Sequence, residues 1–288
     1  MSKFHKKCLL FFFFILVCNS LFAEETRKND NKKRILPFYA DWAREKGIEL
    51  PAPFGISYFF TYMGRDIDVT DISVEFGGRD PESISDFSSF AVKNQTYVSA
   101  IKFDTWILPV VNVYLLAGYA NTNSNLNANI TIDRAILSLP PVEMSLNTST
   151  IVKGAYTGIG TTMVGGYKSW FVLGDANYGI TWPDLLNNSI NFTMLSLRSG
   201  FSGKIGDRNA LRAWLGVAYM NSKSTLEIIE NSAVLGEVIL QIEQHPVNPW
   251  TYQCGFLTSV GKKFEFMTEL GSNFKDASVF VLNVSYRL

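Results

Sequence analysis

The feature that most constrains this chain is a strict two-residue alternation of apolar and polar side chains. In the final ten residues, VFVLNVSYRL, apolar side chains occupy every second position, while Asn283, Ser285 and Arg287 lie between them. Successive side chains of a β-strand point to opposite faces of the sheet. The segment is therefore predicted to be a strand with one apolar face and one largely polar face.

The same alternation recurs along most of the chain. Further apolar or aromatic faces of this kind lie within 54–62, 97–103, 111–119, 170–182, 211–219, 250–260 and 264–270. The composition agrees with strands, because aromatic residues make up 14% of the chain, with 22 Phe and 12 Tyr. We expect an all-β fold.

The faces opposite the apolar ones carry charged side chains separated by small residues. Their charged members are Lys102, Asp175, Arg198, Arg212, Glu265, Glu269 and Arg287. In a closed barrel these residues are predicted to face the lumen, where oppositely charged side chains can pair across it. Such pairs either brace a filled interior or line a conducting path, and the alternation is compatible with both.

Alternation alone does not distinguish a membrane barrel from a water-soluble sandwich or a lipocalin-like barrel. Aromatic residues near the strand ends favour the membrane, because Tyr and Trp rings prefer the boundary between lipid and water. The predicted girdle consists of Trp106, Tyr119, Tyr167, Trp170, Trp182, Tyr219, Trp250 and Tyr286. The sequence therefore favours a transmembrane, antiparallel, up-and-down β-barrel.

The lengths of the connections set the number of strands. Short links at 105–110, 165–169, 204–210 and 261–263 alternate with longer polar connections around 121–153, 183–189, 221–249 and 272–277. With 54–77 as one long strand, an even strand number is reached at ten. Eight or twelve remain open, because 232–245 can add a hairpin arm in an external loop.

The N-terminus has the pattern of a secretory signal peptide. A cationic start containing Lys3, Lys6 and Lys7 precedes an apolar run, and Ala23 precedes Glu24. Cleavage is expected after Ala23, so residues 1–23 form the signal. A transmembrane anchor is the alternative, but the apolar run is short for one. Lipoprotein cleavage before Cys18 is a second alternative.

Charge and cysteine content narrow the class further. The whole chain has 26 basic and 26 acidic residues, and removal of the signal leaves 23 against 26, a net charge of −3. This balance gives no reason to expect a nucleic-acid partner. Only Cys254 remains after cleavage, so no intramolecular disulfide can form. Residues 24–53 are predicted to be a periplasmic leader with a short helix over 37–46, and the barrel to span 54–288.

Val284, Tyr286 and Leu288 in the last strand resemble the C-terminal strand of Gram-negative outer-membrane β-barrel proteins. The stretches NPWTYQCGF and YTGIGTTMVGGY look like those of uncharacterised porin-like families. This resemblance implies a barrel, outer-membrane residence and recognition by the barrel-assembly machinery. The predicted signal peptide implies export through the Sec pathway, and contact with outer-membrane lipid is expected. Leu288 departs from the terminal Phe or Trp usual in that group.

The motifs give no positive sign of catalysis. The one histidine after the signal, His245, lies in QIEQHPVNPW, which is predicted to be a solvated loop. No metal-ligand cluster or cofactor motif occurs in the sequence, so neither a metal nor a cofactor is expected. A small porin-like channel or transport barrel is the leading hypothesis. A structural or surface-interaction barrel with a plugged lumen is the alternative, and a lipid-modifying enzyme is a distant third.

Overall fold

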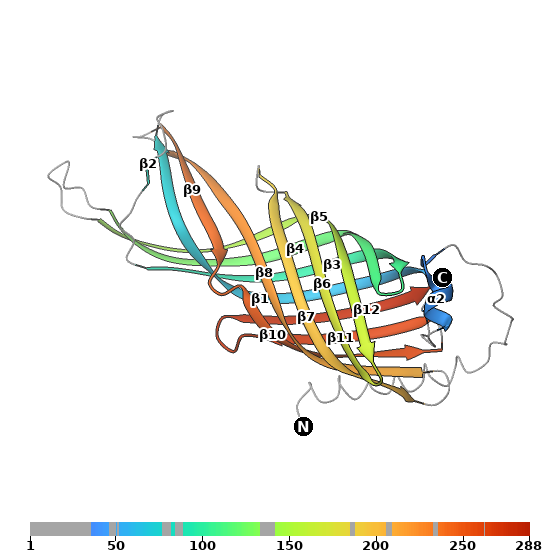
Figure 1. Cartoon of the computed structure of the whole chain (residues 1–288). Coiled ribbons are helices and arrows are strands. Elements are labelled where there is room, and N and C mark those ends of the chain that lie inside the picture. Colours follow the sequence, from blue (N-terminus) through green and yellow to red (C-terminus); the bar gives the residue numbers. More distant parts are fainter. Residues whose placement is uncertain are drawn as a thin grey trace, which may run out of the picture.

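The computed structural model describes residues 36–45, 50, 52–76, 82–83, 89–132, 142–184, 188–205, 209–232, 236–261 and 263–288 (Figure 1). The predicted signal peptide, and the predicted leader up to residue 35, lie outside the described residues and stay predictions. Among the described residues, no helix is both long enough and apolar enough to cross a bilayer.

The alternating segments form long antiparallel strands, as their β-branched and aromatic composition predicts. The ring strands are β1 (Phe54–Phe76), β3 (Ser89–Leu108), β4 (Val111–Ile132), β5 (Val142–Tyr167), β6 (Trp170–Pro183), β7 (Ile190–Ile205), β8 (Asn209–Ser232), β10 (Trp250–Val260), β11 (Phe264–Ser272) and β12 (Ala277–Arg287). Each pairs with its neighbour in this order, and β8 pairs with β10. The described strands thus build a ten-strand wall, which confirms the predicted number.

The wall closes where the last strand meets the first. β12 pairs with β1 from Gly55↔Arg287 to Arg65↔Ala277. Beyond the last pair, the Leu288 amide donates to the carbonyl oxygen of Phe54 at 2.9 Å. Closure gives every ring strand a partner on both sides, so no free strand edge is left in the ring. The fold is a closed antiparallel β-barrel, as predicted.

One end of the barrel carries the short connections. β3–β4, β5–β6, β7–β8 and β10–β11 are joined there by links of two to three residues. Lys168 and Gly261 have positive φ angles of 55° and 65° at two of these turns. The helix α2 (Ala40–Glu45) lies at this end beside the C-terminus (Figure 1). The Phe38 amide ties its start to the Ile107 carbonyl oxygen at 2.8 Å. α2 lies within the predicted 37–46, while its periplasmic placement stays a prediction.

The other end is built differently from the prediction. The regions predicted as polar connections, 121–153 and 221–249, are largely strand, because β4 and β5 pair as far as Ile132↔Val142. β9 (Gly236–Pro246) pairs with β8 on one side and with β1 on the other. Beyond the ring, β9 therefore lies between β8 and β1, where β10, β11 and β12 lie within the ring. β2 (Glu82–Ser83) adds a short pairing to β1.

Candidate functional site

The two faces of the barrel wall differ in chemistry. On the outer face, large apolar side chains are exposed, for example Leu215 (71%), Ile159 (58%) and Leu197 (55%). On the inner face, polar side chains are buried, and Glu269 (1%), Gln253 (4%) and Asp104 (5%) are examples. This is the reverse of a water-soluble protein, which buries apolar side chains and exposes polar ones. The interior is the candidate functional site.

Aromatic side chains form two belts on the outer face. Tyr167, Trp170 and Tyr286 lie at the short-turn end, and Tyr119, Trp182, Tyr219 and Trp250 lie toward the other end. Trp170 and Trp182 stand twelve residues apart on β6 and are about half exposed. At about 3.3 Å per residue and a strand tilt of about 40°, their separation along the barrel axis is about 30 Å. That spacing suits the hydrocarbon layer of a bilayer.

Trp106 does not belong to either belt. It pairs with Asn112, a buried residue of the inner face, and the side chain two positions before it is the buried Asp104. The girdle assignment of Trp106 from the sequence was wrong, because proximity to a strand end gives the height of a residue but not its face. The register with β4 gives the face.

The first inner cluster joins β12 to β3 across β1. Arg287 Nη1 forms an ion pair with Asp104 Oδ2, and Arg287 Nε lies 3.2 Å from Glu265 Oε2. Asn112 Nδ2 donates to the same Asp104 oxygen at 2.8 Å. The intervening residue of β1 is Gly55, where a Cβ atom would lie 2.5 Å from Arg287 Nη1. The arginine can therefore lie flat along the wall only because this position has no side chain.

The second cluster joins β7 to β11 across β8 and β10. Arg198 Nε and Nη2 donate to the two carboxylate oxygens of Glu269 at 2.6 and 3.0 Å. Trp214 Nε1 donates to Glu269 Oε2 at 2.7 Å. A Cβ atom at Gly216 would lie 3.0 Å from Arg198, and one at Gly255 would lie 2.6 Å from the Trp214 ring. This two-point geometry holds a carboxylate that is 1% exposed.

The third cluster joins β4 to β6 across β5. The Tyr114 hydroxyl donates to Asp175 at 2.9 Å, and Thr162 Oγ1 donates to the other Asp175 oxygen at 2.6 Å. Asn177 Nδ2 also donates to Asp175, at 3.3 Å. The Tyr114 ring lies over Gly160, where a Cβ atom would be 2.3 Å away. The hydrogen bonds to Asp175 therefore come from neutral side chains, whereas those to Asp104 and Glu269 come in part from arginines.

The remaining predicted inner cations lie differently. The Lys102 ammonium lies 5.1 Å from the centre of the Tyr114 ring. It also interacts electrostatically with Asp104, Asp175 and Glu265, so it links the first and third clusters. Arg212 is on the inner-face register with Ser202, but it is exposed and stands outside the three clusters.

An apolar cluster fills part of the interior beside these charges. Ala100, Tyr114, Leu116 and Tyr156 are buried together, and the Tyr156 ring stacks on Phe192 at 5.5 Å between centroids. This apolar cluster therefore narrows the interior of the described barrel, and the alternation pattern did not predict it. Inward glycines on neighbouring strands are the signal that could have found it, because they make room for large side chains.

His245 lies in β9 and not in a loop. It pairs with Asp68 of β1 through the backbone register. The predicted loop was wrong. β9 ends at Pro246, so His245 is the second-last residue of the strand. Among the described residues, no group of three or more His, Cys, Asp or Glu side chains is arranged to hold a metal ion.

No protein-family model matches the chain, and no curated protein matches its sequence. Among solved structures, the chain is similar to the outer membrane protein OprG from Pseudomonas aeruginosa, with 11% identity, a TM-score of 0.40, and coverage of 83% of this chain and 99% of that one. The Ralstonia pickettii toluene transporter TbuX gives 11% identity and a TM-score of 0.35, with coverage of 83% and 90%.

A third similar structure is the transport unit of the autotransporter AIDA-I from Escherichia coli. Its identity is 7% and its TM-score is 0.38, with coverage of 95% of both chains. At such values we derive neither fold nor function from these proteins. The fold given above comes from the strand pairing of this chain alone.

Proposed function

We propose that this protein is an outer-membrane β-barrel that passes ions or small polar solutes through a constricted lumen. The observation that carries the proposal is the opposite chemistry of the two faces of one closed wall. Apolar side chains and two aromatic belts face outward, whereas paired charges face inward. Lipid suits the outer face and water suits the inner one.

The route to the membrane is part of the proposal. The signal peptide over 1–23 would direct export through the Sec pathway, and the last strand would be read by the barrel-assembly machinery. Val284 and Tyr286 lie on the outer face of β12, and the Leu288 side chain is 65% exposed. These side chains are therefore accessible to a partner protein before the barrel enters lipid.

The inner clusters would act as the constriction of the channel. Each ties together strands that are not adjacent in the ring, and the carboxylates of Asp104, Glu269 and Asp175 each have at least two polar partners. A buried charge without a partner costs several kcal/mol, so a cluster opens only when its members are hydrated together. Conduction in this proposal requires such hydration, and the narrow ten-strand lumen limits passage to small solutes.

A second function is favoured by one specific observation. Glu269 and Asp104 are 1% and 5% exposed, so little water reaches them in this conformation. A barrel whose lumen stays filled in this way would be structural, or would act through the long β4–β5 and β8–β9 hairpins. This plugged barrel is the alternative to the channel.

Single-channel recording in planar bilayers tests the two functions. The double variant Arg198→Ser/Glu269→Ser removes a whole pair, so it leaves no buried unpaired charge, and it widens the lumen. The control is Arg44→Ser/Asp41→Ser, which removes an exposed ion pair of 3.0 Å on α2 outside the barrel wall.

For a channel, the wild-type protein gives small conductance steps, the lumen double variant gives larger ones, and the α2 control matches the wild type. A plugged barrel gives no steps in the wild type, whatever the double variant does. Silence of the wild type in correctly folded, inserted protein would therefore contradict the channel and support the alternative.

A further inference from the structure

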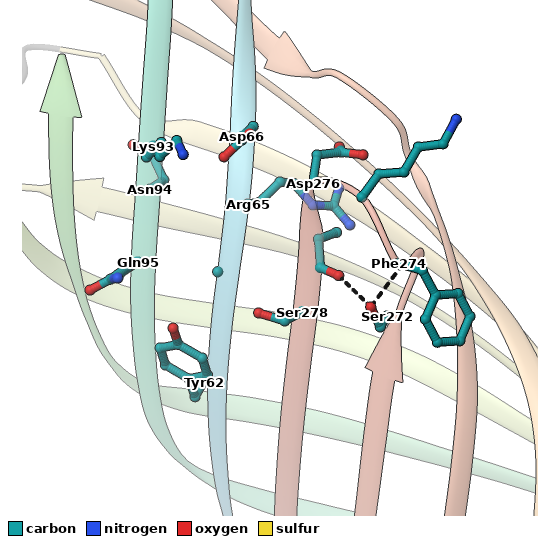
Figure 2. A pocket seen from close by; sticks show the side chains of 13 residues that line it. Tyr62, Arg65, Asp66, Lys93, Asn94, Gln95, Ser272, Phe274, Asp276 and Ser278 are labelled. Carbon is teal, nitrogen blue, oxygen red and sulfur yellow. Dashed lines mark hydrogen bonds between the residues drawn. The ribbon is translucent and has the colours of Figure 1, made fainter. Parts of the chain in front are cut away.

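A pocket lies in the wall where β1 changes its partner. β1 pairs with β12 as far as Arg65↔Ala277 and with β9 from Ile67↔Pro246 onward. Between these two sets of pairs, the turn between β11 and β12 contacts β1. The Asp66 amide donates to the Asp276 carbonyl oxygen there at 2.9 Å. The pocket beside this turn has a volume of about 360 Å³ (Figure 2).

The pocket opens on the outer face of the barrel. Its floor is Gly64, where a Cβ atom would lie 3.0 Å from Ser278 Oγ and 3.2 Å from the Tyr62 hydroxyl. Tyr62 belongs to the outer-face set and packs on Tyr97 with ring centroids 5.2 Å apart. The pocket therefore lies at the level of the aromatic belt away from the short turns. Lipid headgroups occupy that level in a membrane.

Cationic groups outnumber anionic ones around this pocket. Lys93, Lys275 and Arg65 line it together with Asp66 and Asp276, which leaves one net positive charge. Both lysines are exposed, and Lys93 lies on β3 (Figure 2), while Lys275 lies in the β11–β12 turn. Their flexible ammonium groups suit a charged ligand at the membrane surface.

The buried wall of the pocket holds unpaired polar atoms. Arg65 is 5% exposed, and its Nη1 donates to the Met220 carbonyl oxygen at 3.3 Å. Its Nε has no hydrogen-bond partner among the described residues, and neither has the buried Asp276 Oδ2. Arg65 and Asp276 interact electrostatically, although no hydrogen bond joins these two atoms. Because buried polar atoms are nearly always hydrogen-bonded, the Arg65 Nε and the Asp276 Oδ2 can each take a further partner.

We propose that this pocket binds the phosphate-bearing headgroup of a lipid in the surrounding leaflet. The phosphate oxygens accept from the lysines, and a headgroup hydroxyl or protonated phosphate oxygen can donate to the free acceptor. The acyl chains lie on the apolar wall below, where Phe60 and Phe280 pack edge to face at 6.5 Å. This inference rests on the proposed membrane placement of the barrel and not on conduction. A divalent cation fits less well, because two lysine ammoniums flank the carboxylates.

Native mass spectrometry of the full protein in detergent tests the site with three probes. Phosphatidic acid carries the phosphate on a lipid, monogalactosyldiacylglycerol carries a sugar without phosphate, and inorganic phosphate carries no lipid. The variants are Lys93→Gln/Lys275→Gln, which removes both exposed cations, and Gly64→Leu, which fills the floor without changing charge. The matched control is Lys168→Gln/Lys263→Gln, which neutralises two exposed lysines beside aromatic rings at the short-turn end.

The expected result is specific binding of phosphatidic acid to the wild type, weakened about tenfold in the Lys93/Lys275 variant and in Gly64→Leu, and unchanged in the control. Equal binding of the galactolipid, equal loss in the control, or unaltered binding in both pocket variants would overturn the proposal. If inorganic phosphate bound as tightly as phosphatidic acid, the ligand would be free phosphate, and the proposal of a lipid headgroup would be overturned.

Each variant is first checked by the gel mobility of boiled and unboiled samples. A heat-dependent shift shows that the barrel is folded, so a loss of binding then reports the pocket alone. The lipid assay uses no bilayer recording. A silent channel with normal lipid binding would contradict the proposed conduction only, and a conducting barrel without lipid binding would contradict the pocket only.

Discussion

At the scale of single residues, glycine decides where the long inner side chains can lie. Gly55, Gly160 and Gly255 each occupy the inner face of a strand whose two neighbours carry a bonded pair. Any side chain there would stand between the partners. In these three cases the bonded groups are on strands two apart, with a glycine on the strand between them, whereas Arg198 and Glu269 meet across two strands.

Gly55→Val should destabilise the barrel. The new Cβ atom would lie 2.5 Å from Arg287 Nη1 and 2.6 Å from Asp104 Oδ1, so the ion pair must separate inside the lumen. Separating a buried pair leaves uncompensated charges and costs about 3 kcal/mol. Urea unfolding of the protein in detergent micelles, followed by tryptophan fluorescence, measures the change in the free energy of unfolding.

Gly174→Val is the matched control for that experiment. A Cβ atom at Gly174 meets nothing within 4 Å, because this residue is on the outer face of β6. The control should unfold at nearly the same urea concentration as the wild type. If both variants were destabilised equally, a general loss at strand glycines would replace the explanation by the Arg287–Asp104 pair.

The candidate site could be read from the sequence only in part. Alternation assigns Arg198 and Glu269 to the polar faces of their strands, and the structure places both inside. Their pairing does not follow from alternation, because strand tilt and register decide which residues of distant strands meet. Tyr114 and Trp214 went unnoticed because an aromatic ring on a polar face gives no periodic signal.

At the scale of strands, the ring was predictable and its extensions were not. The two-residue alternation of side chains, the short turns and the even number of strands locate each strand of the ring. β1 is one long strand, as expected. The segments 121–153 and 221–249 are rich in Asn, Ser and Thr, so they were predicted to be polar connections, although 232–245 was left open as a hairpin arm. That composition hid the apolar alternation within them, such as Leu126, Ala128 and Ile130, and the structure forms strands there, including β9.

Removal of the last three residues should prevent stable closure. Tyr286, Arg287 and Leu288 hold backbone bonds to both neighbours, including Arg287 N to the Lys263 carbonyl oxygen at 2.7 Å. Arg287 also pairs with Asp104 and Glu265. A free edge in lipid costs several kcal/mol for each unpaired group. The truncated protein should therefore lose the fast-migrating band of unboiled samples in outer-membrane extracts.

Leu288→Ala serves as the control for the truncation, since it keeps the backbone bond to Phe54 and changes only an exposed side chain. Its unboiled band should stay. A truncated chain that still shows the heat-dependent shift would mean that the seam closes without its last pairs, and that the ring is held mainly by the rest of β12.

At the scale of the whole molecule, the barrel has two unlike ends. The short turns, α2 and the C-terminus share one end, whereas long hairpins extend from the other (Figure 1). Outer-membrane barrels place short turns in the periplasm and long hairpins outside the cell. The same orientation here would put the lysine-flanked pocket in the outer leaflet and the end with α2 in the periplasm.

Epitope tags at the two ends should report this orientation. A tag inserted between β4 and β5, within 133–141, should bind antibody on intact cells, because the hairpin would extend outward. A tag inserted between β7 and β8, within 206–208, should bind only after the outer membrane is permeabilised. Flow cytometry before and after permeabilisation measures both, with the heat-dependent gel shift as the folding control. The reverse labelling would invert the barrel, whereas labelling of both tags on intact cells would contradict membrane insertion itself, because a spanning wall must keep its ends apart.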